Sequence, residues 1–385
     1  MSLGTLFGAW AGGALVTRLG PRRSLQATVA PLLIGCVAIA LAPNAVILLG
    51  ARLVLGFGCG SSSVAGSLYA VEIADVAVRG AMGIIGTLAT GLGGLFTVSV
   101  GCIVSWYHLA LVGAIAPSVL LVGTFFISDS PAILVLHGKY HEAMIVLRKL
   151  RGPHADLHSE IETIEMKNSC RAGGWQKLLS WYMAKRVATI VMIFAFQQFC
   201  GNYVFIVHTA RILRKMGIPW DADRSTIIVA AVRIVGNLVS ISIVDRVGRR
   251  TCLIASHAIT SASLTTLGIF VYLAEAAPPE NTIFSRLAWV PLFCLVLVMF
   301  GLHVGIHPVP FVLAAEYFPT SVRGQTFSVC LSSGMLFAFL ALQFYSPMLA
   351  ALTQPGLYWF YAAVSILAVA FTFSFVEETK GKNIG

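Results

Sequence analysis

The sequence predicts an all-α membrane protein that crosses the bilayer many times. Apolar residues make up 57% of the 385 residues and charged residues only 11%, whereas a soluble domain carries about 25% charged residues. Asp, Glu, Lys and Arg are all missing from the stretches 24–51, 80–128, 251–274, 287–315 and 324–376. Because a spanning helix needs about 20 apolar residues, the longest of these stretches are expected to hold two helices each.

Hydropathy predicts eleven spanning helices. They cover residues 1–17, 24–43, 46–70, 81–105, 109–127, 187–209, 225–244, 251–274, 287–313, 324–346 and 356–376. The cysteines follow neither a metal-binding spacing nor a disulfide framework. We therefore expect no metal and no cofactor.

The distribution of positive charge predicts the orientation, since Lys and Arg concentrate in cytoplasmic loops. If the loop with Arg18 is cytoplasmic, 19 of the 26 basic residues lie inside, nine of them in 128–186. The other seven are Arg52, Arg211, Arg214, Lys215, Arg224, Arg233 and Arg286. The net charge of +10 then reflects topology and does not indicate nucleic-acid binding. This orientation places the C-terminus in the cytoplasm.

Two loop sequences occur twice, which predicts two similar halves. Residues 18–23 (RLGPRR) correspond to 245–250 (DRVGRR), and 72–80 (EIADVAVRG) to 316–324 (EYFPTSVRG). Such a repeat between membrane spans is typical of a transporter. The predicted organisation is a five-span N-terminal bundle at 1–127, a cytoplasmic linker with amphipathic helices at 128–186, a six-span C-terminal bundle at 187–376 and a cytoplasmic tail at 377–385.

These motifs resemble those of the sugar porter family of the major facilitator superfamily, and most of all its insect trehalose and hexose transporters. The family patterns D-R-x-G-R-R, Q-Q-x-x-G, P-x-P and P-E-T-K-G fit 245–250, 197–201, 308–310 and 377–381. The resemblance covers nearly the whole chain. It implies two pseudo-symmetric helical bundles and a plasma-membrane location.

The resemblance also implies an altered first half. Two spans precede Asp245, whereas only residues 1–17 precede Arg18, so the family's first helix is expected to be missing. Thr17 and Ala132 stand where the family carries charges, which predicts a looser cytoplasmic gate in this half.

Acidic and basic residues at the predicted cytoplasmic ends form a candidate gate. Glu72 and Arg79 are seven residues apart, as are the later glutamate and arginine of the second copy, so each pair can lie on one helix face about two turns apart. Ion pairs between the bundles would hold the cytoplasmic side shut in one state. The alternative is simple anchoring at the membrane interface. The predicted gating residues are Arg18, Arg22, Arg23, Glu72, Arg79, Asp245, Arg246, Arg249, Arg250, Glu316 and Arg323.

Polar groups at membrane depth are costly and form the candidate substrate site. Gln197 and Gln198 lie within a span without charges, and an amide suits a sugar hydroxyl. Pro308 and Pro310 would break the ninth span and free backbone groups. Hydrogen bonding between helices is the alternative role for the glutamines. The predicted substrate-binding residues are Gln197, Gln198, Asn202, Thr87, Arg233, His307 and Phe311, several of which differ from the usual sugar contacts of the family.

Arg233 and two histidines leave a second functional reading open. Arg233 lies 12 residues before Asp245, about 18 Å from the cytoplasmic end and near mid-membrane. There it could bind a carboxylate or neighbouring carbonyl groups. His303 and His307, at i and i+4, could couple transport to protons or be ordinary hydrogen-bonded histidines.

The sequence thus predicts transport of a hexose or a trehalose-like disaccharide by alternating access, as facilitated diffusion. The alternatives are an organic-anion or proton-coupled carrier that uses Arg233, His303 and His307, and a non-transporting truncated isoform. The expected partners are the sugar and the lipid bilayer. An enzyme is not indicated, because the sequence has no nucleophile–base or metal-ligand pattern outside the spans.

Overall fold

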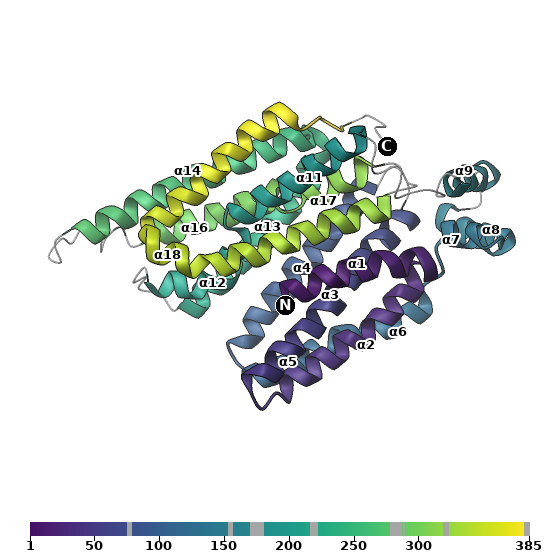
Figure 1. Ribbon diagram of the computed structural model, residues 1–385, viewed down its shortest axis with the longest axis horizontal. Coiled ribbons are helices and arrows are strands. Elements are labelled where there is room, and N and C mark those ends of the chain that lie inside the picture. Colours follow the sequence, from purple (N-terminus) through teal and green to yellow (C-terminus); the bar gives the residue numbers. More distant parts are fainter. Residues whose placement is uncertain are drawn as a thin grey trace.

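The computed structural model of the protein is helical, as predicted (Figure 1). It describes residues 1–74, 79–152, 157–169, 181–215, 222–277, 287, 289–318 and 323–380. Within these ranges every regular element is a helix.

The N-terminal half consists of α1 (Ser2–Leu19), α2 (Pro21–Ala40), α3 (Ala45–Ile73), α4 (Arg79–Gly101), α5 (Trp106–Gly113) and α6 (Ile115–Phe126). The turn between α1 and α2 is formed by Gly20 at φ 82°, and Pro21 follows at the first helical position, where its missing N–H costs nothing. Asn44 caps α3 by accepting a hydrogen bond from the Ile47 amide at 2.9 Å. These sequence signals explain why the helices begin where they do.

Three short helices follow in the linker: α7 (Pro131–Leu136), α8 (Tyr140–Arg151) and α9 (Leu157–Ser169). Leu147 of α8 is buried against a small apolar cluster that includes Leu134 and Ile161. Arg151 attaches this unit to the end of α3, because it donates to the Ile73 carbonyl at 3.0 Å and pairs with Glu160 at 3.0 Å.

The C-terminal half consists of α11 (Trp181–Phe199), α12 (Asn202–Lys215), α13 (Ala222–Val247), α14 (Arg249–Ala276), α16 (Val290–Gly301), the π-helix η2 (Leu302–Ile306), α17 (Val309–Glu316) and α18 (Arg323–Phe375). The 53-residue α18 contains two helices, since Thr353 at φ 63° breaks it. The predicted span 187–209 is also interrupted, because the chain turns at Gly201 (φ 93°) between α11 and α12.

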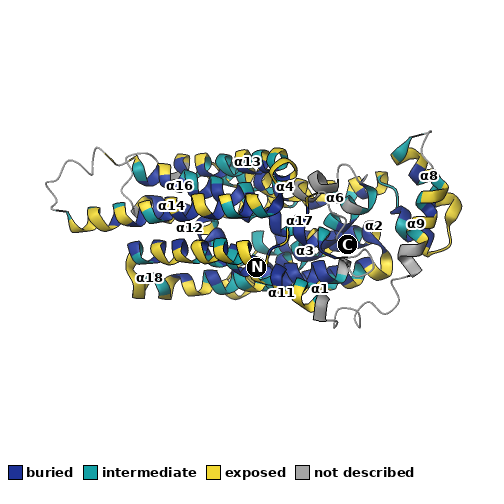
Figure 2. Ribbon diagram, turned by 90° about the horizontal axis from the view of Figure 1, so that it is seen from above, coloured by how far each residue is buried: buried dark blue, intermediate teal, exposed yellow. Residues whose placement is uncertain are grey.

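Among the described residues, eight helical stretches are long and apolar enough to cross a membrane. One of these is the kinked α18, which covers two predicted spans, and a shorter apolar helix covers 85–101. The predicted span 1–17 lies on α1, which is not among these stretches. The eleven predicted spans therefore correspond to helical segments of the structure. Large apolar side chains such as Phe7, Trp10, Phe125 and Ile366 are exposed on the outside, as lipid-facing residues are, and buried residues lie where helices face one another (Figure 2).

The two halves lie side by side as two helical bundles (Figure 1). Two helix pairs join them most extensively: α1 packs on α18, and α4 packs on α13. The second pair carries polar residues at membrane depth and positions the candidate site.

Candidate functional site

The ninth predicted span is broken by a π-helix and two prolines. The His307 amide donates to the Leu302 carbonyl, five residues back, at 2.7 Å. Pro310 has no N–H and cannot donate to the Ile306 carbonyl one helical turn before it. The break predicted at Pro308 and Pro310 is therefore confirmed, and it leaves carbonyl groups that need other donors.

Gln197 of α11 supplies those donors. Its side-chain Nε2 donates to the carbonyls of Ile306 at 2.9 Å and His307 at 3.0 Å, and its Oε1 accepts from Gln198 Nε2 at 2.9 Å. Both N–H groups of the amide and one of the two lone pairs of its oxygen are thus used within the protein. This is the interhelical role that was the alternative in the sequence analysis, and contact of Gln197 with substrate stays a prediction.

Two neighbouring side-chain amides have polar atoms that find no hydrogen-bond partner among the described residues. Gln198 Oε1 is buried and has no hydrogen-bond partner in the described structure. Asn202, which opens α12 directly after the break at Gly201, is fully buried, and both polar atoms of its side chain lack a partner there. A buried polar atom without a partner costs about 1–3 kcal/mol, so these groups are the strongest candidates for contact with a polar ligand.

A hydrogen bond crosses between the bundles at the α4–α13 contact. Asn237 Nδ2 of α13 donates to the backbone carbonyl of Thr87 in α4 at 3.2 Å. The predicted site residue Thr87 therefore lies at the bundle interface. The sequence analysis missed Asn237, although its place one helical turn after Arg233 inside an apolar span was a usable signal.

Glycines of α4 make this contact possible. A Cβ added to Gly91 would lie 3.1 Å from Asn237 Nδ2, and one added to Gly94 would lie 3.3 Å from Arg233 Nη1. The helix backbones can therefore approach each other closely, as small residues allow in membranes.

We expect Gly91→Leu to separate α4 from α13 and to lower the free energy of unfolding by about 1–3 kcal/mol, the usual cost of overpacking. Gly93→Leu is the matched control, since Gly93 lies on the same helix with nothing within 4 Å of its added Cβ. Denaturant unfolding in detergent measures both. Equal losses of stability in the two variants would contradict the close contact at Gly91.

The predicted residues Arg233, His307 and Phe311 come together with His303. Arg233 Nε donates to His303 Nε2 at 3.2 Å, and the His303 and His307 rings stack with centroids 5.2 Å apart. The Phe311 ring lies 5.9 Å from His307 and meets Phe194 edge-on at 5.4 Å. The shared face of the two histidines, predicted from their spacing, is confirmed.

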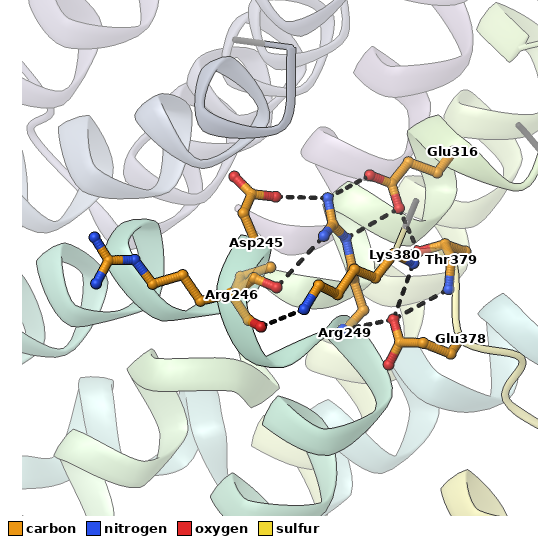
Figure 3. A network of polar contacts seen from close by, with 8 residues as sticks. Asp245, Arg246, Arg249, Glu316, Glu378, Thr379 and Lys380 are labelled. Carbon is orange, nitrogen blue, oxygen red and sulfur yellow. Dashed lines mark hydrogen bonds and ion pairs between the residues drawn. The ribbon is translucent and has the colours of Figure 1, made fainter. Parts of the chain in front are cut away.

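A second cluster of polar residues lies at the ends of α13, α14 and α17 (Figure 3). Arg249 opens α14 and pairs with Glu316 of α17 through two bonds, Nη2 to Oε1 at 2.8 Å and Nε to Oε2 at 3.2 Å. Its Nη2 also lies 2.7 Å from Asp245 Oδ1. Two-point pairing of a guanidinium with a carboxylate is among the strong polar contacts of proteins.

The C-terminal tail completes this cluster. Glu378 accepts hydrogen bonds from the Arg249 and Arg250 amides at 2.9 and 3.1 Å. These amides stand at the start of α14, where backbone N–H groups have no acceptor within the helix. The Thr379 hydroxyl donates to Glu316 at 2.6 Å, and the Tyr317 hydroxyl donates to the Glu377 carbonyl at 3.0 Å. Burial raises the pKa of Tyr317 to about 12, so its hydroxyl stays protonated at neutral pH.

The first half repeats only part of this arrangement. Ser130 Oγ donates to Glu72, as Thr379 does to Glu316, and Arg22 lies 3.5 Å from Asp129. The turns before α2 and α14 align by their glycines, Gly20 (φ 82°) and Gly248 (φ 101°), one residue out of step with the pairing of 18–23 and 245–250. In this alignment Pro21 occupies the first position of α2, where α14 has Arg249. The bidentate arginine of the second copy therefore has no counterpart at this position of the first.

The described ion pairs of Asp245, Arg249 and Glu316 lie within the C-terminal half. The described contacts of Arg22 with Asp129 and of Glu72 with Ser130 lie within the N-terminal half and its linker. Ion pairs between the bundles, expected from the sequence, stay a prediction. Glu72 and Glu316 each accept a hydrogen bond from a hydroxyl a few residues beyond the last helix of their own half. The side chains of Arg79 and Arg323 lie outside the described residues. Arg18, Arg23 and Arg246 are exposed, and gating by this set stays a prediction.

Comparison with known proteins gives matches along the full chain. A family profile described as "Sugar (and other) transporter" matches residues 1–384. The facilitated trehalose transporter Tret1 of Drosophila yakuba is 30% identical over 389 residues, which cover all of this chain and 45% of that protein. Tret1 of Apis mellifera ligustica is also 30% identical, with 76% of its length covered. The chain thus spans about half of the first relative and about three quarters of the second.

Solved structures match the fold. The proton:xylose symporter XylE of the major facilitator superfamily, bound to 6-bromo-6-deoxy-D-glucose, superposes with a TM-score of 0.85 at 23% identity. The match covers 100% of this chain and 86% of that one. An inward-open structure of the xylose transporter XylE from E. coli gives a TM-score of 0.77 at 22% identity.

Proposed function

Because this chain belongs to the sugar transporter family, we propose that it is a carrier of the major facilitator superfamily that moves a hexose or a trehalose-like disaccharide across a membrane by facilitated diffusion. The two bundles would alternate between states that open the cavity to either side. The names of the insect relatives, facilitated trehalose transporters, support this choice of substrate. They favour a sugar over an organic anion of another class, and facilitated diffusion over proton coupling.

The observation that carries the proposal is the set of buried amide groups that find no hydrogen-bond partner among the described residues. Asn202 has both a donor and an acceptor free, and Gln198 has a free acceptor. A sugar hydroxyl both donates and accepts hydrogen bonds and can satisfy such groups. Gln197 stabilises the site, because it donates hydrogen bonds to the carbonyls of the broken span beside Gln198.

Uptake by proteoliposomes tests this function. We expect trehalose or glucose to enter until inside and outside concentrations are equal, at a rate that saturates with substrate and does not depend on a proton gradient. Protein-free liposomes and liposomes with Asn202→Ala serve as controls, and the Asn202 variant should lose most of the uptake. Folded protein that transports neither sugar would contradict the proposal, and accumulation driven by a proton gradient would contradict facilitated diffusion.

We further propose that the protein lies in the plasma membrane with its C-terminal tail in the cytoplasm. Glu378 of the tail is bonded to Arg249 and Arg250, and positive charges of this kind predict a cytoplasmic face. A tag placed after residue 385 should be accessible to antibody only after the cells are permeabilised. Labelling of intact cells would contradict this orientation.

A further inference from the structure

Arg233 is a cation at membrane depth without a nearby carboxylate. It lies well inside the apolar stretch Arg224–Val247. The nearest acids of the same helix, Asp223 and Asp245, are ten and twelve residues away, about 15 and 18 Å along the axis. The helices that face it, α4 and α16 with η2, contain no Asp or Glu. A charge in this position normally pairs with another charge or faces a water-filled cavity.

The hydrogen-bond partner that the described residues give Arg233 is neutral. Arginine can only donate, so His303 Nε2 accepts its bond at 3.2 Å. His303 Nδ1 then carries the proton and donates to the Met299 carbonyl at 2.9 Å. Among the described residues no Asp or Glu forms an ion pair or a hydrogen bond with Arg233. The positive charge is therefore uncompensated within the described structure.

The free part of the guanidinium points to the contact between the bundles. Nη1 is the atom that a Cβ on Gly94 of α4 would approach to 3.3 Å. The described residues provide no hydrogen-bond partner for either terminal nitrogen, so their four N–H groups remain available. His307, stacked on His303, has a buried Nδ1 that also finds no partner there.

We propose that Arg233 binds an anion between α13 and α4, and that a carboxylate on the transported sugar supplies this anion. Two oxygens of a carboxylate accept parallel hydrogen bonds from the two terminal nitrogens of arginine. The Nε contact with His303 orients the guanidinium, and the missing side chain of Gly94 lets the guanidinium lie close to the α4 backbone. The proposal rests on the proposed function and narrows its substrate class to sugars such as uronates, whose acid group replaces a terminal CH₂OH.

Glucose and glucuronate form a matched pair of ligands, since they share the ring and differ only at C6. Binding to the purified full chain in detergent is measured by ligand-dependent shifts of the thermal unfolding midpoint, in buffer with methanesulfonate in place of chloride. We expect glucuronate to bind about 10- to 100-fold more tightly than glucose, the effect of one hydrogen-bonded charge pair. Arg233→Gln should remove this preference, and Arg233→Lys, which keeps the charge but not the two-point geometry, should retain part of it.

Chloride is the other possible source of the anion, and titration with chloride distinguishes the two. One possible result is that chloride stabilises the wild-type chain but not Arg233→Gln, and that glucuronate binds no more tightly than glucose. This result would overturn the proposal that a sugar carboxylate is the ligand and would leave a site for an inorganic anion. Equal affinities for glucose and glucuronate, together with no effect of chloride, would overturn the anion site altogether. If Arg233→Gln fails to fold, the comparison of the two sugars on the wild-type chain still decides.

The same experiment separates this proposal from the proposed function. Uptake of glucose without any anion effect would leave sugar transport standing and remove the role of Arg233. An Arg233-dependent effect of chloride in a chain that binds and transports neither sugar would keep the anion site and remove sugar transport.

Discussion

Replacing Arg249 with alanine is expected to lower the free energy of unfolding by about 3 kcal/mol, the cost of removing one partner from a largely buried ion pair. The Arg249 side chain is only 8% exposed, and its bidentate partner Glu316 is 28% exposed. The variant would leave that carboxylate with the Thr379 hydroxyl but without a cation. Denaturant titration of the purified chain in detergent measures the loss.

Asp245→Asn is the matched control for this prediction. The Asp245 side chain is 52% exposed, and ion pairs with exposed carboxylates contribute about 1 kcal/mol or less. Asp245→Asn should therefore cost well under half of what Arg249→Ala costs. If the two substitutions destabilise the protein equally, the Arg249–Glu316 pair is not the dominant contact of the cluster.

Replacing Gln197 with alanine is expected to cost about 2–3 kcal/mol of stability, because it leaves two buried carbonyls without donors and removes the acceptor of Gln198. The loss should appear in the unfolding free energy of the chain without any sugar. Transport should also fall, since the carbonyls of Ile306 and His307 belong to the broken span beside the candidate site.

Gln198→Ala is the control, since Gln198 makes one of the three hydrogen bonds of this set. It should cost about 1 kcal/mol, the usual contribution of a single hydrogen bond. A Gln197→Ala variant with unchanged stability but weakened sugar binding would show that the main role of Gln197 is ligand contact and that its bonds to the span contribute little.

The contacts of Gln197 show how far the candidate site could be predicted. An amide in a span without charges must find partners, so its importance followed from sequence. Its partners could not be predicted from the sequence, because they lie 109 and 110 residues away. They also depend on a π-helix that shifts the register of the chain at His307. The same limit applies to Asn237, whose partner is a backbone carbonyl 150 residues earlier.

The charged loops show a different limit. The candidate gate predicted from the sequence contains Asp245, Arg249 and Glu316, and in the structure Arg249 contacts both of these carboxylates. The sequence did not predict the role of the tail, which brings Glu378 and Thr379 back to the start of α14 and links these groups within one half.

The sequence by itself determined the helical class, the positions of the spans and the two-fold repeat. These follow from apolar length and from charge placement, which act locally along the chain. The packing of the helices settles which polar groups at membrane depth are satisfied by the protein. It also settles which of them, like Asn202 and the terminal nitrogens of Arg233, find no partner among the described residues. Partners of buried polar groups are selected by the packing of helices distant in sequence, and the pattern of residues along a single helix does not contain that information.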